Sequence, residues 1–349
     1  MFHDYLNMFD TAHMRDALLD LFEVLDTPTD KRKQIDPFMS EALAAFPYVN
    51  GGLFTDSKAE LRRQIPQFND KCRTLLLKNA SEEFDWSGIS PTIFGAMFES
   101  TLNQETRRNG GMHYTSIENI HKVIDPLFLD DLKKELENIL NGKQINVRKD
   151  ALVKYRKKLG SLTFLDPACG SGNFLTLTYT ELRKLENIAL KQYLVDSGTY
   201  QEGMMVLVNE KDFYPIVVSV NNFYGIEIND FAVKVAQTAL WIAESQMWEE
   251  TKSIYPSVPD YLPLTSLPNI ICKNALRIDW NDVIPSEKLS YIISNPPFVS
   301  NSGKQSDENA VIITFMTDEQ KEDRTALFGD EGGILDYVAC WYKKSSIIH

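Results

Sequence analysis

The chain has 349 residues, which is enough for two domains with separate hydrophobic cores. Its apolar content of 43% and charged content of 24% are typical of globular proteins, and no apolar run approaches the length that crosses a bilayer. The net charge of −13 is unfavourable for binding nucleic acid, because contacts with phosphates need a basic surface. A local basic cleft is nevertheless compatible with this charge.

The cysteines and the N-terminus indicate a cellular compartment. The four cysteines (Cys72, Cys169, Cys272 and Cys340) form no CxxC pair, so we expect reduced thiols rather than a disulfide or zinc framework. The five histidines have no metal-ligand spacing. No basic region followed by an apolar block opens the chain. These features predict a cytoplasmic protein with no metal site and no membrane partner.

Residues 1–110 carry mainly helical signals. Apolar residues recur near a 3.6-residue period from Phe2 to Leu25, which predicts one or two amphipathic helices. Asn69–Lys78 and Pro91–Leu102 are predicted as further helices, the second with Ser90 as its N-cap. No recognisable chemistry lies here, so we expect a helical domain that packs against or connects to a catalytic part, residues 111–349.

The segment GMHYTS, residues 111–116, precedes a predicted helix that begins at Ile117 with Ser116 as its N-cap. Pro126 interrupts the pattern, and a second helix extends to about Leu140. A polar, basic stretch, Asn141–Lys158, then leads into a buried strand. Taken alone, GMHYTS is typical of an ordinary loop before a helix.

The segment FLDPACGSGNF, residues 164–174, has the pattern of a nucleotide-binding turn. A strand over Leu162–Leu165 is followed by Asp166, by a turn on Gly170 and Gly172, and by a helix that begins at Asn173. Two glycines let a backbone approach a ligand closely, and the helix N-terminus offers free N–H groups. A ligand-free strand–turn–helix connection is the alternative. The missing third glycine argues against a dinucleotide.

A second strand is predicted in NFYGIEIND, residues 222–230. Glu227 at its end is placed to accept the ribose hydroxyls of an adenosine cofactor, and Ile226 and Ile228 could flank the adenine. The spacing from Asp166 exceeds the roughly 20 residues of the simple fingerprint, which an insertion over 192–221 would explain.

Three further segments follow in order. Phe231–Trp248 is predicted as an apolar helix, Tyr255–Pro268 as extended chain, and Asn269–Cys272 as a short strand. The segment Lys273-Asn274-Ala275-Leu276 follows that strand.

The segment SYIISNPPFVS, residues 290–300, predicts a buried strand with Asn295-Pro296-Pro297-Phe298 at its carboxyl end. An amino nitrogen conjugated to a purine is a poor nucleophile. Hydrogen bonds to the Asn295 oxygen and the Pro296 carbonyl would favour a tetrahedral nitrogen. The prolines stiffen the loop, and Phe298 offers a face for an extruded base. A rigid loop with an incidental aromatic is the alternative.

The end of the chain carries weaker signals. Residues 300–333 are polar and are expected to be mobile, either as a lid over DNA or as disordered chain. Glu319-x-Lys321 has the form of a nuclease ExK, but no partner aspartate on a strand precedes it, so we reject that interpretation. Leu335–Ile348 is predicted as an amphipathic helix.

DPACGSGNF resembles the cofactor loop of S-adenosylmethionine-dependent DNA methyltransferases that modify amino groups, and GMHYTS resembles the GxxYTP segment of adenine methyltransferases, with Ser116 in place of proline. The order of the segments resembles that of the gamma-type amino methyltransferases: YTS, DPACGSGNF, GIEIND, KNAL, NPPF and DYVACWYKK. It is most similar to the MmeI-like (type IIL) restriction–modification enzymes, over about residues 85–349.

The resemblance implies an α/β fold, a Rossmann-like class I methyltransferase sheet preceded by a mostly helical connector. It implies transfer of a methyl group from S-adenosylmethionine to a flipped adenine in double-stranded DNA. The implied catalytic residues are Asn295, Pro296, Pro297 and Phe298. The implied cofactor-binding residues are Tyr114, Thr115, Asp166, Pro167, Ala168, Gly170, Gly172, Asn173, Phe174, Glu227, Ile228, Asn274 and Asn295.

The chain departs from that family pattern at its end, because the later sheet strands and the target-recognition region have no counterpart in the sequence. We therefore expect a fragment or one product of a split gene, with a separate target-recognition or companion chain. One alternative is a catalytically silent chain that binds cofactor or a partner subunit. A further alternative is methylation of a protein glutamine, since related NPP loops act on amide nitrogens.

Overall fold

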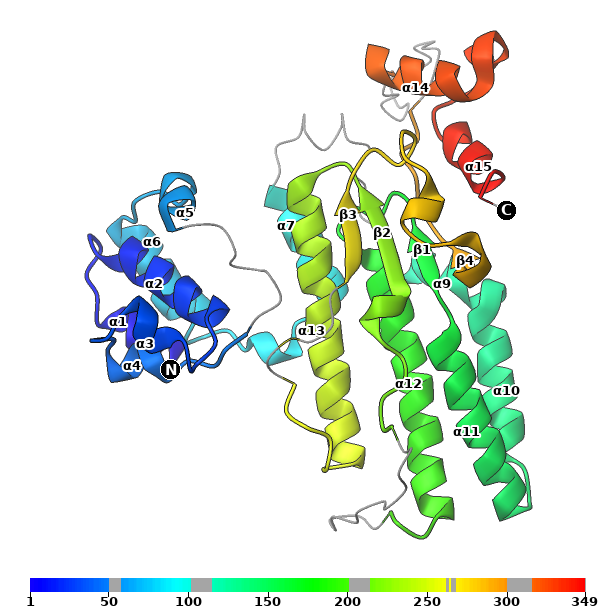
Figure 1. The fold of residues 1–349 in the computed structure, drawn as a ribbon, viewed down its shortest axis with the longest axis horizontal. Coiled ribbons are helices and arrows are strands. Elements are labelled where there is room, and N and C mark those ends of the chain that lie inside the picture. The colour runs from blue at the N-terminus through cyan, green and yellow to red at the C-terminus, as the bar shows by residue number, and fades with distance from the viewer. Residues whose placement is uncertain are drawn as a thin grey trace. The chain divides into compact units, whose positions relative to one another are not determined.

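The computed structural model describes residues 1–49, 58–101, 115–200, 214–261, 264, 268–299 and 316–348. The chain folds as two compact units, Met1–Ile89 with Pro259–Leu267, and Ser90–Val258 with Pro268–His349 (Figure 1). The predicted functional division at residue 110 stays a prediction. In the described part of the chain, no helix is long and apolar enough to cross a membrane.

The first unit is helical, as predicted. Its N-terminal helices bury one apolar face each, with Leu6, Leu18 and Leu21 in a common core. The buried Arg32 guanidinium donates hydrogen bonds to backbone carbonyls that α-helical pairing leaves open, including that of Phe46 at 2.6 Å. The helices are α1 (Phe2–Asn7), α2 (Met14–Asp26), α3 (Arg32–Ile35), α4 (Glu41–Ala44), α5 (Lys58–Gln64) and α6 (Asp70–Thr74), followed by a π-helix (Leu75–Ala80) and a 3-10 turn (Trp86–Gly88).

The second unit contains a parallel sheet, which confirms the predicted α/β class. Its strands are β1 (Phe164–Asp166), β2 (Phe223–Glu227), β3 (Asn269–Cys272) and β4 (Tyr291–Ile292), in the spatial order β3-β2-β1-β4. All neighbouring pairs are parallel. The two strands that carry the strongest sequence patterns, β1 and β4, are therefore direct neighbours.

Both faces of this sheet are buried, as parallel sheets require. Side chains alternate between the faces along each strand. Phe164 and Phe223 stack at 5.2 Å in a core shared with long helices, whereas Leu165 and Ile226 lie in a second core with Trp280. The alternation explains why each strand has a nearly continuous apolar sequence.

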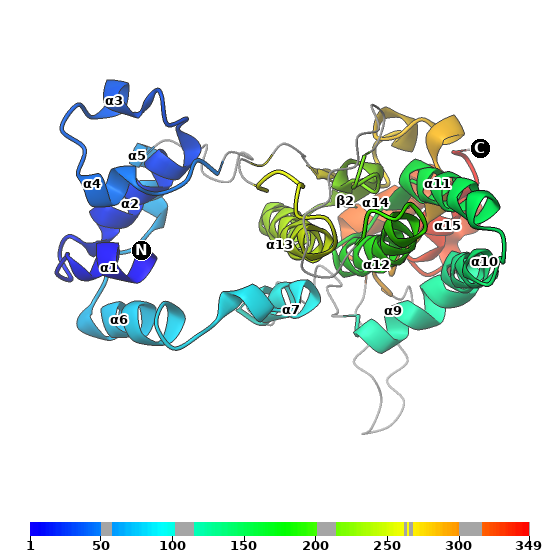
Figure 2. The same ribbon diagram turned by 90° about the horizontal axis from the view of Figure 1, so that it is seen from below.

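Three long helices lie side by side against the first of these cores, namely α11 (Ile145–Ser161), α12 (Asn173–Asp196) and α13 (Asp230–Ile254) (Figures 1 and 2). Ser116 caps α9 as predicted, because its Oγ accepts a hydrogen bond from the Asn119 N–H at 3.4 Å. The other described helices of this unit that precede β2 are α7 (Pro91–Thr101), α9 (Ile117–Ile124), a π-helical turn (Asp125–Leu129) that carries Pro126, α10 (Asp130–Leu140) and a 3-10 turn (Val220–Asn222).

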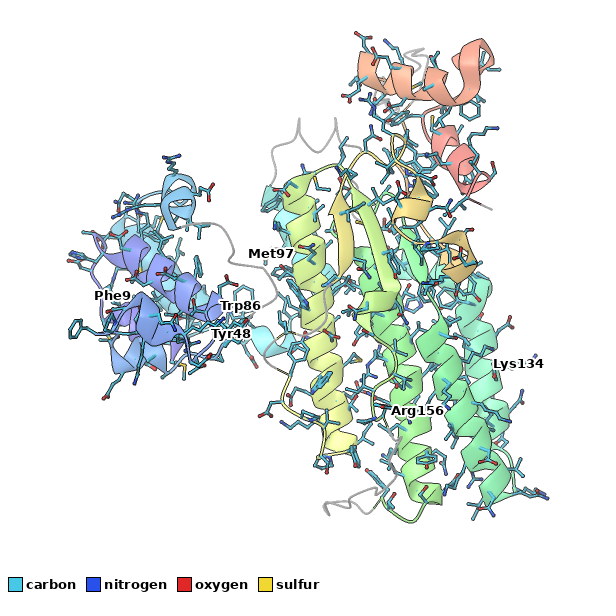
Figure 3. All side chains as sticks on the ribbon, viewed as in Figure 1. Phe9, Tyr48, Trp86, Met97, Lys134 and Arg156 are labelled. Atoms are coloured by element: carbon cyan, nitrogen blue, oxygen red, sulfur yellow. The ribbon has the colours of Figure 1, made fainter. Side chains whose placement is uncertain are left out.

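A buried charged cluster ties α11 and α12 to the segment that leads into β2. The carboxylate of Glu186, fully buried on α12, contacts the Arg183 guanidinium and lies 3.5 Å from Nη2 of Arg156, the α11 residue that Figure 3 labels. It also accepts hydrogen bonds from the N–H groups of Val217 at 2.6 Å and Val218 at 3.3 Å. The single carboxylate of Glu186 thus pairs with two arginines and accepts hydrogen bonds from two backbone N–H groups.

Two segments contain helices that the sequence analysis did not identify. The basic stretch before β1 is largely helix, α11, whose buried residues Leu152, Tyr155 and Leu159 follow helical spacing. The stretch predicted to be mobile contains α14 (Asp318–Phe328) and a 3-10 turn (Gly329–Ile334); residues 300–315 lie outside the described residues. The predicted C-terminal helix is confirmed but shorter, as α15 (Ala339–Ser345).

Candidate functional site

The carboxyl ends of the strands converge on one edge of the sheet, where ligand sites gather in open α/β folds. Backbone hydrogen bonds join the loops there. The Cys169 N–H donates to the Ile226 carbonyl at 3.1 Å, and the Lys273 N–H donates to the Glu227 carbonyl at 2.9 Å. The loops after β1, β2 and β3 therefore form one connected surface.

The turn after β1 requires its glycines. Gly170 and Gly172 have φ angles of 52° and 79°, in the left-handed region that favours glycine. A Cβ on Gly172 would also lie 2.9 Å from the Cβ of Ala236 on α13. Helix α12 begins at Asn173, as predicted. The turn is therefore packed closely against α13, and larger side chains would push it away from the site.

Glu227 connects this turn to the end of β2. Its Oε2 accepts a hydrogen bond from the Gly170 N–H at 2.9 Å, and its Oε1 accepts one from the Asn229 N–H at 2.9 Å. Its side chain is buried. Each carboxylate oxygen has further lone pairs, so a carboxylate fixed in this way can still accept hydrogen bonds from a ligand.

Asp166 connects β1 to the loop after β4. Its Oδ1 accepts hydrogen bonds from the Ser294 hydroxyl at 2.6 Å and from the Ala168 N–H at 3.1 Å. Burial raises the pKa of the Asp166 carboxyl to about 7; the two hydrogen bonds oppose this shift, and the charge of Glu227 adds to it. The carboxyl therefore titrates close to neutral pH.

This raised pKa predicts a distinctive pH dependence of stability. The folded state holds the Asp166 proton up to about pH 7, whereas the unfolded chain releases it near its ordinary value of 3.8. The contribution to stability is thus complete below pH 4 and is lost as the pH rises towards and through 7. Relative to Asp166→Asn, we expect the free energy of unfolding to fall by up to about 1.4 kcal/mol per pH unit between pH 5 and 6.5.

Urea unfolding of the wild type and the variant at several pH values measures this difference. Asp318→Asn is the control, because that side chain is 95% exposed and its substitution should leave the wild-type profile between pH 5 and 6.5 unchanged. If the free energies of unfolding of the wild type and Asp166→Asn changed with pH in parallel, the raised pKa of a buried Asp166 carboxyl would be contradicted.

The NPPF loop follows β4. The Asn295 Nδ2 donates a hydrogen bond to the Thr115 hydroxyl at 3.1 Å, which leaves the Asn295 amide oxygen to accept hydrogen bonds. Phe298 is 69% exposed. Tyr114, the other residue predicted from the GMHYTS segment, lies outside the described residues. The structure thus brings Thr115 and Asn295 together across a long stretch of sequence.

A cavity of about 220 Å³ opens at the same edge of the sheet. Six predicted site residues line it: Pro167, Ala168, Glu227, Ile228, Asn274 and Pro297. Residues that the sequence interpretation missed form the opposite wall, namely Asp323 on α14, Tyr337, and Trp341 on α15. The Trp341 Nε1–H donates to the Pro167 carbonyl at 3.1 Å, which fixes that wall to the loop after β1.

Other predicted residues lie beside the cavity rather than in its lining. Phe174 is buried in the core under the sheet. Asn173 is also buried, and its Oδ1 has no hydrogen-bond partner among the described residues. Asp166 and Gly170 instead form hydrogen bonds with the lining residues Ala168 and Glu227, and Gly172 packs against α13. The roles assigned to these residues stay predictions. Within the described ranges, no three His, Cys, Asp or Glu side chains are grouped to hold a metal ion.

Known families that match the chain agree with this geometry. The family described as MmeI, DNA-methyltransferase domain matches residues 142–349, which is more than half of the chain. The chain belongs to the MmeI DNA-methyltransferase family. A second family, described as MmeI, helicase spacer domain, matches residues 1–54. The predicted resemblance to MmeI-like enzymes is confirmed.

Individual proteins that are similar to this chain include methyltransferases and restriction–modification enzymes. DNA methyltransferase A of Bacillus subtilis is 37% identical over 95% of this chain and 34% of its own length. A putative type II restriction enzyme and methyltransferase of Methanocaldococcus jannaschii is 25% identical over 98% of this chain and 30% of its own. The solved structure of the type IIL restriction–modification enzyme MmeI in complex with DNA covers 99% of this chain, with a TM-score of 0.81 and 39% identity. The chain spans 42% of that MmeI chain and about a third of the two curated relatives.

Proposed function

We propose that this chain binds S-adenosylmethionine and transfers its methyl group to the exocyclic amino group of a flipped adenine in double-stranded DNA, as the methylase part of a restriction–modification system. Residues 111–349 form the methyltransferase core in this proposal, and residues 1–110 form a helical connector. The observation that carries it is the meeting of three loops, those with DPACGSGNF, GIEIND and NPPF, around one cavity at the strand ends.

The residues present fit an adenosine cofactor. Glu227 is a carboxylate fixed at the cavity wall by two backbone N–H groups, and carboxylate oxygens are the acceptors that ribose hydroxyls require. Asn274 offers an amide and Ile228 an apolar surface to the base. The cavity of about 220 Å³ is below the roughly 300 Å³ at which drug-sized pockets begin, which suits the nucleoside part of the cofactor rather than all of it. The bound cofactor would supply an electrophilic methyl group.

The chain's own residues would activate and position the acceptor. With its Nδ2 held by Thr115, the Asn295 amide presents its oxygen to one hydrogen of the adenine amino group, and the Pro296 carbonyl accepts the other. Two such bonds favour a tetrahedral nitrogen with a localised lone pair. The exposed ring of Phe298 provides a stacking surface for the extruded base. The rate then comes mainly from positioning, and the surplus proton leaves to water.

DNA as the partner is supported by the solved MmeI structure, which is a complex with DNA. The acidic balance of this chain, with a net charge of −13, indicates that most phosphate contacts come from another region or chain. We therefore propose a target-recognition region or companion chain as a further partner, and a cytoplasmic location.

Calorimetric titration with S-adenosylmethionine tests the cofactor site. Glu227→Ala should weaken binding at least about tenfold, because charge-assisted hydrogen bonds are worth roughly 1.5–3 kcal/mol each. Glu287→Ala is the matched control and should bind as the wild type does. It changes an exposed glutamate in a 3-10 turn (Ser286–Lys288) before β4. Unchanged affinity in folded Glu227→Ala would contradict the site.

Incubation with duplex DNA and labelled cofactor then tests the reaction. Nuclease digestion should release labelled N6-methyladenine. Cofactor binding without any transfer would overturn the proposed activity in favour of a silent module, and label on protein glutamine would assign a different acceptor.

A further inference from the structure

The wall of the cavity opposite the sheet carries a buried carboxylate that the proposed reaction does not use. Asp323 on α14 is only 5% exposed. It accepts hydrogen bonds from three side chains: Arg277 Nε at 2.6 Å, the Tyr337 hydroxyl at 2.9 Å and Asn274 Nδ2 at 3.1 Å. Its third partner, Asn274, is the residue expected to contact the adenine of the cofactor.

Asp323 determines which way the Asn274 amide points. The Asn274 Oδ1 accepts a hydrogen bond from the Leu276 N–H at 2.9 Å, while its Nδ2 donates to Asp323. A backbone N–H can only donate and a carboxylate can only accept. Rotating the amide by 180° would therefore break both bonds at once. It would place the amide nitrogen against the Leu276 N–H and the amide oxygen against the Asp323 carboxylate. The orientation is fixed by its two partners.

The fixed amide retains one hydrogen-bonding position on each atom. Its oxygen can accept one further hydrogen bond and its nitrogen can donate one, and both Asn274 and Asp323 line the cavity. Asparagine can recognise adenine by a pair of hydrogen bonds. At the edge that carries N1, its oxygen would accept from the 6-amino group and its nitrogen would donate to N1. A 6-oxo purine offers the reverse pattern, an acceptor at position 6 and a protonated N1.

We infer that Asp323 is a positioning residue that holds the Asn274 amide in one orientation and thereby makes the cavity select a 6-amino purine over a 6-oxo purine. The inference rests on the proposed function, because it deepens the recognition of the same cofactor. It places specificity for the nucleoside on α14, which comes from sequence after the NPPF loop.

The test compares two probes by calorimetry, S-adenosylhomocysteine and S-inosylhomocysteine, which differ only at the purine 6-position and N1. The wild type should prefer the adenosyl probe by about ten- to a hundredfold. Asp323→Asn should reduce that ratio by about tenfold, because an amide at position 323 can donate or accept, so that only the Leu276 N–H still favours the original orientation of Asn274. Asp318→Asn on the same helix is the control and should leave the ratio unchanged.

The outcomes separate the alternatives. If Asp323 only supports the fold, its substitution weakens both probes equally and keeps the ratio, which overturns the inference. A wild type that binds both probes equally also overturns it while leaving the proposed cofactor site standing. A folded wild type that binds neither probe contradicts the proposed function itself. If Asp323→Asn does not fold, Asn274→Ala takes its place: persistent preference for the adenosyl probe in that variant would overturn the inference.

Discussion

Replacement of Asn295 by alanine is expected to lower the rate of methyl transfer by about a thousandfold, or roughly 4 kcal/mol of transition-state stabilisation. The substitution removes the side-chain oxygen that would accept a hydrogen bond from the adenine amino group as it becomes tetrahedral. Cofactor affinity should change much less, since interactions made only in the transition state affect rate rather than binding. Single-turnover methylation of duplex DNA and calorimetry measure the two quantities separately.

Thr115→Val provides a graded comparison. It keeps the shape of the side chain but removes the hydroxyl that holds Asn295 Nδ2 at 3.1 Å. The amide then loses its fixed orientation without losing its oxygen, so we expect a rate between those of the wild type and Asn295→Ala. Full activity in Asn295→Ala would show that the NPPF loop does not activate the acceptor in the way proposed.

The second large effect concerns stability. Glu186→Gln should lower the free energy of unfolding by about 3–5 kcal/mol, because it removes the carboxylate that contacts the fully buried Arg183 guanidinium. The change also weakens the acceptor for the Val217 and Val218 N–H groups before β2. Urea unfolding measures the loss.

Glu135→Gln is the matched control for this substitution. Glu135 pairs with Lys158 at 2.5 Å, but both side chains are at least 40% exposed, so the loss should stay below about 1 kcal/mol. Equal effects of the two substitutions would mean that the Glu186 cluster is hydrated and not buried as described.

Local signals in the sequence were enough to place most of the second unit. Ser116 and Pro91 predict the starts of α9 and α7, and the glycine turn predicts the start of α12 at Asn173. The residues of β3, Asn269–Cys272, were also predicted correctly. These features depend on caps, turns and apolar runs, which act over a few neighbouring residues.

The wall of the site formed by α14 and α15 could not be predicted in the same way. The buried residues of α14 include Asp323 and Arg324, so the helix has no apolar face to recognise. The partners that make burial of Asp323 favourable, such as Asn274 and Arg277, come from distant segments and depend on the tertiary fold. One local signal was present: Thr317 and Gln320 form a capping box.

The same limit applies to Phe174 and α11. The resemblance to methyltransferases implied a cofactor contact for Phe174, and that role stays a prediction, but no local signal indicated that its side chain is buried in the core. In α11 the lysines and arginines on the outer face obscured a buried stripe at helical spacing. A count of apolar residues by period rather than by overall polarity would have identified that helix.

The pairing of β1 with β4 has a consequence for synthesis of the protein. Thr163 and Ser290, at the start of these strands, are 127 residues apart. At roughly 5–20 residues per second, the ribosome completes β4 about 6–25 s after β1. β2 emerges earlier and covers one side of β1, but the other side keeps unpaired backbone groups until β4 arrives. During that interval the nascent chain exposes a strand edge of the kind that recruits chaperones or aggregates.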